Sequence, residues 1–239
     1  MEKLSERIGL YDLWVVFFPG IVGMFEQLFF WGTFWSVYCG HSLLAILNWI
    51  APNNMSTWIV IIILSFLLGI VLQEIGRWLR NVTKYKSAMD GLLNPCAGVF
   101  TEKERACFRS VLQKYGWNGE NAEGSKEIFH RINVEAQECG VAARYAKLNV
   151  LQSMSLSLSS AMLLGAIGAL AMLVFGLING RVHIALFMTA ILAVNIVLMI
   201  VFFSRFKRFD RYWVRNIVYA MSTKNAEVEK KDNGKAEGH

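Results

Sequence analysis

The sequence has few cysteines, and their spacing is typical of neither a metal site nor a disulfide framework. The four are Cys39, Cys96, Cys107 and Cys139, and none belongs to a CxxC or CxxH motif. Structural zinc sites and small disulfide-rich domains both need closely patterned ligands or cysteine pairs. We therefore interpret the four as packing residues and expect no bound metal.

Catalytic motifs are also absent from the sequence. It contains no HExxH, no GxSxG, no P-loop and no glycine-rich dinucleotide turn. His130 is the one histidine in the long link between the second and third apolar blocks, and we expect it to pack or to cap a helix. We predict a non-enzymatic protein with no catalytic residue and no cofactor.

Long apolar blocks are the main feature that the sequence does have. Hydrophobic residues make up 55% of the 239 residues, and the mean hydropathy is +0.39. A bilayer core is crossed by roughly 20 apolar residues in a helix. A signal peptide is not expected, because the first block is too long for one. We predict an all-α, polytopic membrane protein with four transmembrane helices, at residues 13–38, 55–72, 153–178 and 183–203.

Polar stretches divide these helices into predicted regions. The link between the second and third spans has a capping-box pattern at Thr101 and Glu104, which indicates a helix start. We predict a small helical cytoplasmic cap there. The predicted regions are an N-terminal transmembrane pair (1–80), the cap (81–150), a transmembrane hairpin (151–203), and a basic juxtamembrane helix with a disordered tail (204–239).

The distribution of lysine and arginine predicts the orientation. All but one of the 24 fall in the N-terminal segment, the long middle link or the C-terminal tail, and Arg181 is the exception. Positively charged loops stay on the cytoplasmic side of a membrane. We therefore expect an inner-membrane protein with both termini in the cytoplasm. The net charge of +6 then reflects topology, and no nucleic-acid partner is expected.

A few polar residues lie inside the predicted spans. Glu26 and Gln27 are about halfway along the first span, and Asn195 lies in the fourth, where it is a candidate for a hydrogen bond between helices. Ionisable groups at membrane depth usually face a bundle interior or water. Glu26 is therefore interpreted either as a neutral or hydrogen-bonded packing residue, or as part of a polar path.

The third span combines serines with small residues. Ser153, Ser157 and Ser160 share one helical stripe, which fits either tight packing against the fourth span or the lining of a pore. Small residues let helices approach closely. The predicted helix-packing residues are Ala161, Gly165, Gly168 and Ala169.

The second span ends in "LLGIVLQEIGR", which places Gln73, Glu74 and Arg77 at the predicted cytoplasmic boundary. Glu74 and Arg77 are spaced to pair along the helix. These residues either anchor the helix exit or form a polar ring at a cytoplasmic mouth.

Basic and aromatic residues alternate after the fourth span, as in helices that lie along an anionic inner leaflet. The residues predicted to contact the membrane lipid are Arg205, Lys207, Arg208, Arg211 and Arg215.

Four stretches in this order carry a resemblance: "YDLWVVFFPG", "LLGIVLQEIGR", "KLNVLQSMSLSLS" and "RFKRFDRYWVRNIVYAM". They resemble a loose group of small four-span bacterial membrane proteins found beside anti-phage defence genes. The resemblance implies a membrane-disrupting effector controlled by a cytosolic sensor or a nucleotide signal, but it implies no ligand residue.

We therefore expect a homo-oligomeric membrane component of a defence system, triggered through the cap by a cytosolic protein partner. Two alternatives remain open at this point. One is a membrane anchor that recruits a soluble partner, and the other is a small ion channel or transporter.

Overall fold

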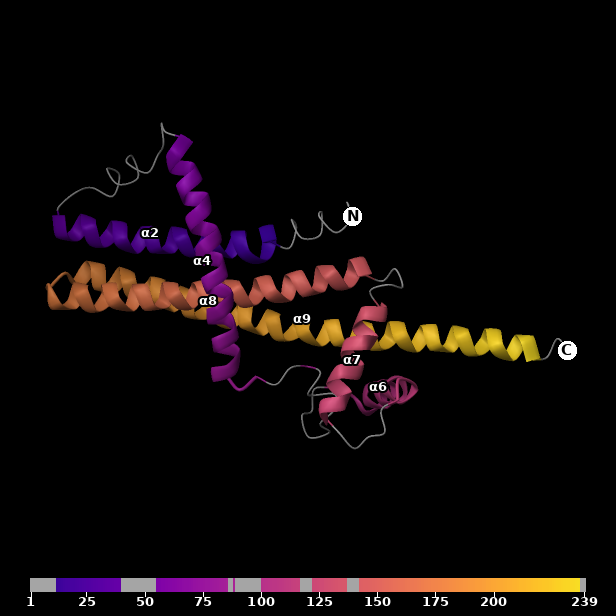
Figure 1. Ribbon diagram of the computed structural model, residues 1–239. Coiled ribbons are helices and arrows are strands. Elements are labelled where there is room, and N and C mark those ends of the chain that lie inside the picture. The colour runs from indigo at the N-terminus through magenta and orange to yellow at the C-terminus, as the bar shows by residue number, and fades with distance from the viewer. Residues whose placement is uncertain are drawn as a thin grey trace. The chain divides into compact units, whose positions relative to one another are not determined.

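The computed structural model in Figure 1 describes residues 12–39, 55–85, 88, 100–116, 122–136 and 142–236. Among these residues the regular elements are all helices, so the predicted all-α fold is confirmed. In chain order they are η1 (Asp12–Phe17), α2 (Phe18–Cys39), α4 (Met55–Val82), α6 (Glu102–Lys114), α7 (Ala122–Ala136), α8 (Ala142–Ile178) and α9 (Val182–Ala236).

Within the described part of the chain, four helical stretches are long and apolar enough to cross a membrane, as predicted. The chain is therefore a multi-pass membrane protein. The four stretches are Leu13–Val37, Trp58–Val82, Lys147–Ile178 and Val182–Lys224.

The chain forms two compact units. The membrane unit consists of Met1–Lys84 and Val150–Phe206, and the polar unit consists of Tyr85–Asn149 and Lys207–His239. Helices α8 and α9 each contribute residues to both units. Each unit is described by itself below.

The first helix of the membrane unit changes form near Pro19. It is π-helical over η1 and becomes α-helical at Phe18. Proline has no N–H to donate to the preceding turn, so a wider turn before Pro19 avoids a lost α-helical hydrogen bond. The helix therefore changes from π to α geometry next to the proline.

A tight turn joins α8 to α9. Gly180 has φ +66°, a conformation that favours glycine, and Arg181 N–H donates to the carbonyl of Gly176 at 2.8 Å. This arrangement closes the C-terminal end of α8 in the usual way for a glycine-terminated helix.

The polar unit has its own apolar core. Helix α6 begins at the predicted capping box, in which Glu104 accepts from Thr101 N–H at 2.9 Å and Thr101 Oγ1 accepts from Glu104 N–H at 3.3 Å. The apolar faces of α6, α7 and α9 then meet. The core residues are Phe108, Val111, Leu112, Phe129, Ile132, Val214, Ile217, Val218 and Met221.

Helix α9 differs from the prediction. The sequence predicted a span that ends at residue 203, a basic helix and then a disordered tail, whereas α9 continues from Val182 to Ala236. No proline lies in this stretch, and its last part is rich in alanine, glutamate and lysine, which favour helix. Before Asn233 and Gly234 the local sequence therefore supplies no stop signal that would end the helix.

Candidate intramembrane polar site

Two polar side chains meet the backbone of α8 at Gly165. A Cβ placed on Gly165 would lie 2.5 Å from Glu26 Oε2 of α2 and 2.7 Å from Asn195 Oδ1 of α9. A larger residue at this position would therefore force both oxygens to move. Glu26, Asn195 and Gly165 therefore form one polar site, to which three helices contribute.

The two oxygens that face Gly165 are shielded. Asn195 is 5% exposed, and Glu26 Oε2 is buried with no hydrogen-bond partner. Asn195 Nδ2 donates to the carbonyl of Ile191 in its own helix at 3.3 Å. Asn195 thus donates a hydrogen bond within α9 and not to another helix, while its Oδ1 faces the site. Gln27, the neighbour of Glu26, is half-buried.

The polar site lies between two apolar clusters of the membrane unit. Along α8, Gly165 falls between Ala161, a member of one cluster, and Ala169, a member of the other. The same order holds on the two other helices, where the flanking cluster members are Val22 and Phe30 on α2, and Met188 and Met199 on α9. The site is therefore a single polar layer between two apolar layers.

Most of the serines of α8 are buried. Of the predicted stripe, Ser157 and Ser160 are buried and Ser153 is half-buried. The hydrogen bond to a neighbouring helix comes from Ser159, which donates to the carbonyl of Met199 at 3.1 Å. Ser160 instead donates to Leu156 within α8 at 3.0 Å. The run "SLSLSS" shows that α8 carries several hydroxyl groups, but it does not identify which of them bonds to another helix.

The predicted packing residues of α8 face α2 as well as α9. Ala161 lies near Gly23 of α2, and a Cβ on Gly168 would lie 2.7 Å from the Phe30 ring. Ala169 is fully buried. We expected packing against the fourth span only, because a short turn joins that span to the third.

Among the described glycines of the membrane unit, the tightest backbone contacts are at Gly20 and Gly69, which were not among the predicted packing residues. A Cβ on Gly20 would overlap the carbonyl of Ser65, and one on Gly69 would overlap the carbonyl of Val16. The sequence signal was present in "SFLLG", where Ser65 and Gly69 have small-xxx-small spacing. Together with Leu72 they lie on the buried face of α4.

An apolar cavity of about 290 Å³ lies between α2 and α4. Ser65 is its one polar lining residue, and Ser65 Oγ is buried without a hydrogen-bond partner. The other lining residues are Phe17, Ile21, Met24, Phe25, Leu28, Trp58, Ile61 and Ile62.

The predicted boundary residues of α4 take two different positions. Glu74 and Arg77 form the predicted pair, with Oε1 and Nη1 at 2.8 Å, and both side chains are more than half exposed. Gln73 is half-buried, and its Nε2 has no hydrogen-bond partner.

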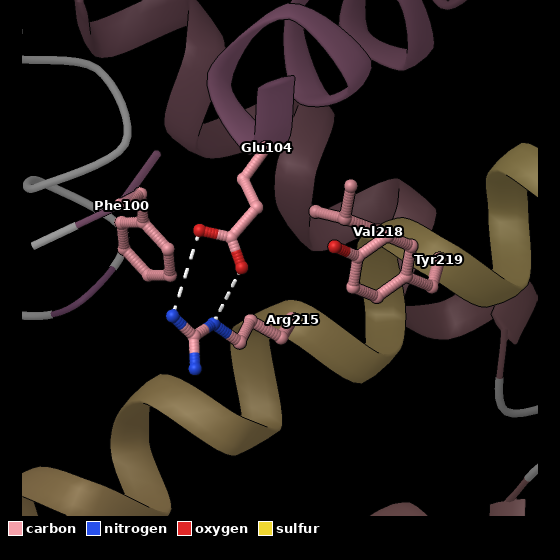
Figure 2. Close-up of a pocket in the computed structure, with 5 residues that line it drawn as sticks. All are labelled: Phe100, Glu104, Arg215, Val218 and Tyr219. Atoms are coloured by element: carbon pink, nitrogen blue, oxygen red, sulfur yellow. Dashed lines mark hydrogen bonds and ion pairs between the residues drawn. The ribbon is translucent and has the colours of Figure 1, made fainter. Parts of the chain in front are cut away.

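Two of the five residues predicted to contact lipid make contacts inside the polar unit. Figure 2 shows Arg215 facing Glu104, with Phe100 beside the pair. Arg215 Nε lies 2.7 Å from Glu104 Oε1, and the guanidinium lies 5.6 Å from the Phe100 ring centroid. Lys207 Nζ lies 5.5 Å from the Tyr85 ring centroid. The other three, Arg205, Arg208 and Arg211, are exposed.

Three acidic residues attach the rest of the polar unit to α9. Burial raises the pKa of Glu104, but hydrogen bonds from Thr101 and the Arg215 charge outweigh it, so this pKa is below its ordinary value. Hydrogen bonds from Lys224 and Tyr115 lower the pKa of Glu135.

The third acidic residue, Asp210, comes from α9 itself. It is 4% exposed and accepts from Tyr85 Oη at 2.9 Å and from Ala88 N–H at 2.7 Å. A buried carboxylate with such donors fixes the position of the backbone that supplies them. Asp210 therefore ties the chain that follows α4 to the last helix.

Comparisons with protein families, curated proteins and solved structures find no match. Among the described residues, no three His, Cys, Asp or Glu side chains are grouped closely enough to hold a metal ion. The geometry of the chain itself is therefore the basis for a functional proposal.

Proposed function

We propose that this chain is a non-enzymatic membrane component of a bacterial anti-phage defence system, which perturbs membrane integrity or potential when it is triggered. The observation that carries the proposal is the polar layer formed by Glu26, Asn195 and Gly165. Polar groups at membrane depth are costly, and where they occur they usually mark a path for ions or protons. The link to defence rests on the sequence resemblance.

The proposed location is the bacterial inner membrane, with both termini and the polar unit in the cytoplasm. The support is the confinement of Lys and Arg to the segments assigned to that side, apart from Arg181. In this orientation a cytosolic partner reaches the polar unit, and the trigger acts there.

Assembly from several copies is part of the proposal. The described face of α4 that points away from the bundle carries exposed apolar side chains, among them Ile59, Ile63 and Leu67. Such a face is suited to lipid or to another copy of the chain. Small polar pores in membranes are commonly built from several helical subunits, so a homo-oligomer would complete the path.

The test is the membrane potential of bacterial cells after induced expression. Wild type should depolarise the membrane, and Glu26→Leu should not, since it removes the carboxyl group from the polar layer. Glu74→Leu is the matched control, because it removes an exposed carboxylate and should leave depolarisation intact. Equal depolarisation by wild type and Glu26→Leu would exclude a path through this layer.

The polar unit favours a second candidate, a membrane anchor that recruits a soluble partner. This unit has a closed core and also exposes Val134, Tyr212 and Tyr219, which are 44%, 44% and 51% exposed. The anchor predicts a stable complex after purification from cells and no change of membrane potential. Depolarisation by wild type would therefore favour the first candidate over the anchor.

A further inference from the structure

The polar layer contains two acceptor oxygens and a shortage of donors. Glu26 Oε2 and Asn195 Oδ1 approach the same point beside Gly165, and Glu26 Oε2 has no hydrogen-bond partner. An ionised carboxylate has only acceptors, as does an amide oxygen. Two such oxygens repel each other unless something positive or a proton lies between them.

The orientation of the Asn195 amide is set by its own helix. Nδ2 donates to the Ile191 carbonyl at 3.3 Å. Exchanging the amide nitrogen and oxygen would place Oδ1 against that carbonyl, and two acceptors would then face each other. Oδ1 is therefore the atom that Asn195 presents to Glu26.

No ionisable side chain of the surrounding helices can neutralise Glu26. The parts of α8, α9 and α4 that form the bundle here, residues 161–169, 191–199 and 61–72, contain no Asp, Glu, His, Lys, Arg, Cys or Tyr. Glu26 is also the only Asp, Glu, His, Lys or Arg residue of α2. An unpaired carboxylate in such surroundings is costly, whereas a neutral carboxyl group supplies the missing O–H donor.

We propose that Glu26 and Asn195 form a proton-binding site inside the membrane unit. The Glu26 carboxylate takes one proton from water and donates the resulting O–H to Asn195 Oδ1. A side chain at Gly165 would displace both oxygens, because its Cβ would lie 2.5 Å from one and 2.7 Å from the other. The inference does not rest on the proposed function, since a proton can be held here whether or not ions cross the membrane.

A lipid-soluble carbodiimide, dicyclohexylcarbodiimide, tests the protonation state directly. The acid proton moves to a nitrogen of the reagent and the carboxylate oxygen bonds to its central carbon. The product rearranges to a stable N-acylurea with no atom lost. The full-length protein in detergent micelles is labelled at neutral pH and mapped by mass spectrometry. We expect one adduct at Glu26, none there in Glu26→Gln, and none at the exposed Glu74.

Infrared spectroscopy tests the role of Asn195. The wild type should show the C=O stretching band of a protonated carboxyl group, which disappears in the isosteric Glu26→Gln. In Asn195→Leu the band should persist at a shifted frequency, because the O–H loses its acceptor. Absence of both the adduct and the band in wild type would overturn the protonated site. An unshifted band in Asn195→Leu would overturn Asn195 as the proton acceptor.

Discussion

The membrane unit and the polar unit share two helices, α8 and α9, yet different contacts hold each of them together. In the membrane unit, backbones approach closely at Gly20 and Gly69, and the apolar clusters are small. In the polar unit, one larger apolar core is reinforced by acidic side chains that bind α9.

The difference follows from the surroundings that we infer for each unit. Lipid removes most of the hydrophobic gain on helix association, so close packing must contribute more of the stability. Where helices associate in water, burial of their apolar faces stabilises them, and ion pairs can add specificity. The membrane unit should therefore be sensitive to shape, and the polar unit to charge.

The largest effect is expected for Gly20→Ala in the membrane unit. The new Cβ would overlap the backbone carbonyl of Ser65, which cannot move without shifting α4. We expect a loss of about 3 kcal/mol in the free energy of unfolding, the upper end for overpacking. Circular dichroism during denaturation in detergent would measure it.

Gly23→Ala is the matched control for this change. Its Cβ would meet only side-chain atoms, of Leu72 at 3.2 Å and of Leu68 at 3.3 Å, which can adjust. The loss should be about a third as large. Equal losses for the two variants would contradict a shape-sensitive crossing at Gly20.

The next largest effect is expected for Asp210→Ala in the polar unit. The change leaves Ala88 N–H and the Tyr85 hydroxyl without their acceptor. An unsatisfied buried donor costs about 1–3 kcal/mol, so we expect a loss of about 2 kcal/mol. Hydrogen exchange in residues 100–116 should accelerate, while exchange in α2 stays unchanged.

Asp210→Asn tests whether the charge or the acceptor matters. It keeps one oxygen in place, so its loss of stability should be about half of the loss for Asp210→Ala. Faster exchange in α2 as well as in α6 would show that the two units do not respond separately.

A smaller effect is expected from acid. Because the pKa values of Glu104 and Glu135 are lowered, each carboxylate contributes stability at pH values above 4.5, and this contribution is lost as the pH falls through the lowered values. Hydrogen exchange at about pH 3, corrected for intrinsic rates, should increase in α6 and α7.

Glu104→Gln should reproduce part of the acid effect at neutral pH, with a loss of roughly 1 kcal/mol. The same variant should then show a weaker dependence on pH than wild type. An unchanged pH dependence would assign the acid sensitivity to other groups.

The smallest effect is expected for Glu74→Gln. Its partner Arg77 is exposed, and both side chains are solvated, so the pair contributes a few tenths of a kcal/mol at most. The denaturation midpoint in detergent should stay within error of wild type. A clear loss would mean that the pair lies in a less polar environment than its exposure indicates.

Several parts of this structure follow from the sequence alone, and they are the local ones. The four apolar blocks, the capping box at Thr101 and the pairing of Glu74 with Arg77 depend on residues close together in the chain. Their physics is set by helix geometry and burial, which sequence periodicity records directly.

The contacts between distant segments could not be predicted in the same way. Glu26 and Asn195 were each conspicuous as polar residues in apolar spans, but their meeting at Gly165 depends on how α2, α8 and α9 rotate about their axes. Apolar blocks facing lipid on most sides carry little periodicity that would fix this rotation. For the same reason the basic pattern after the fourth span did not show that Arg215 pairs with Glu104.

The division of α9 between the two units has a consequence for biosynthesis. The polar unit needs Val214, Ile217 and Met221 to complete the core begun by α6 and α7. On the ribosome these residues are made after the parts of α8 and α9 that belong to the membrane unit. The apolar faces of α6 and α7 are therefore made well before the residues that cover them. This interval is when we expect chaperones to engage the nascent chain.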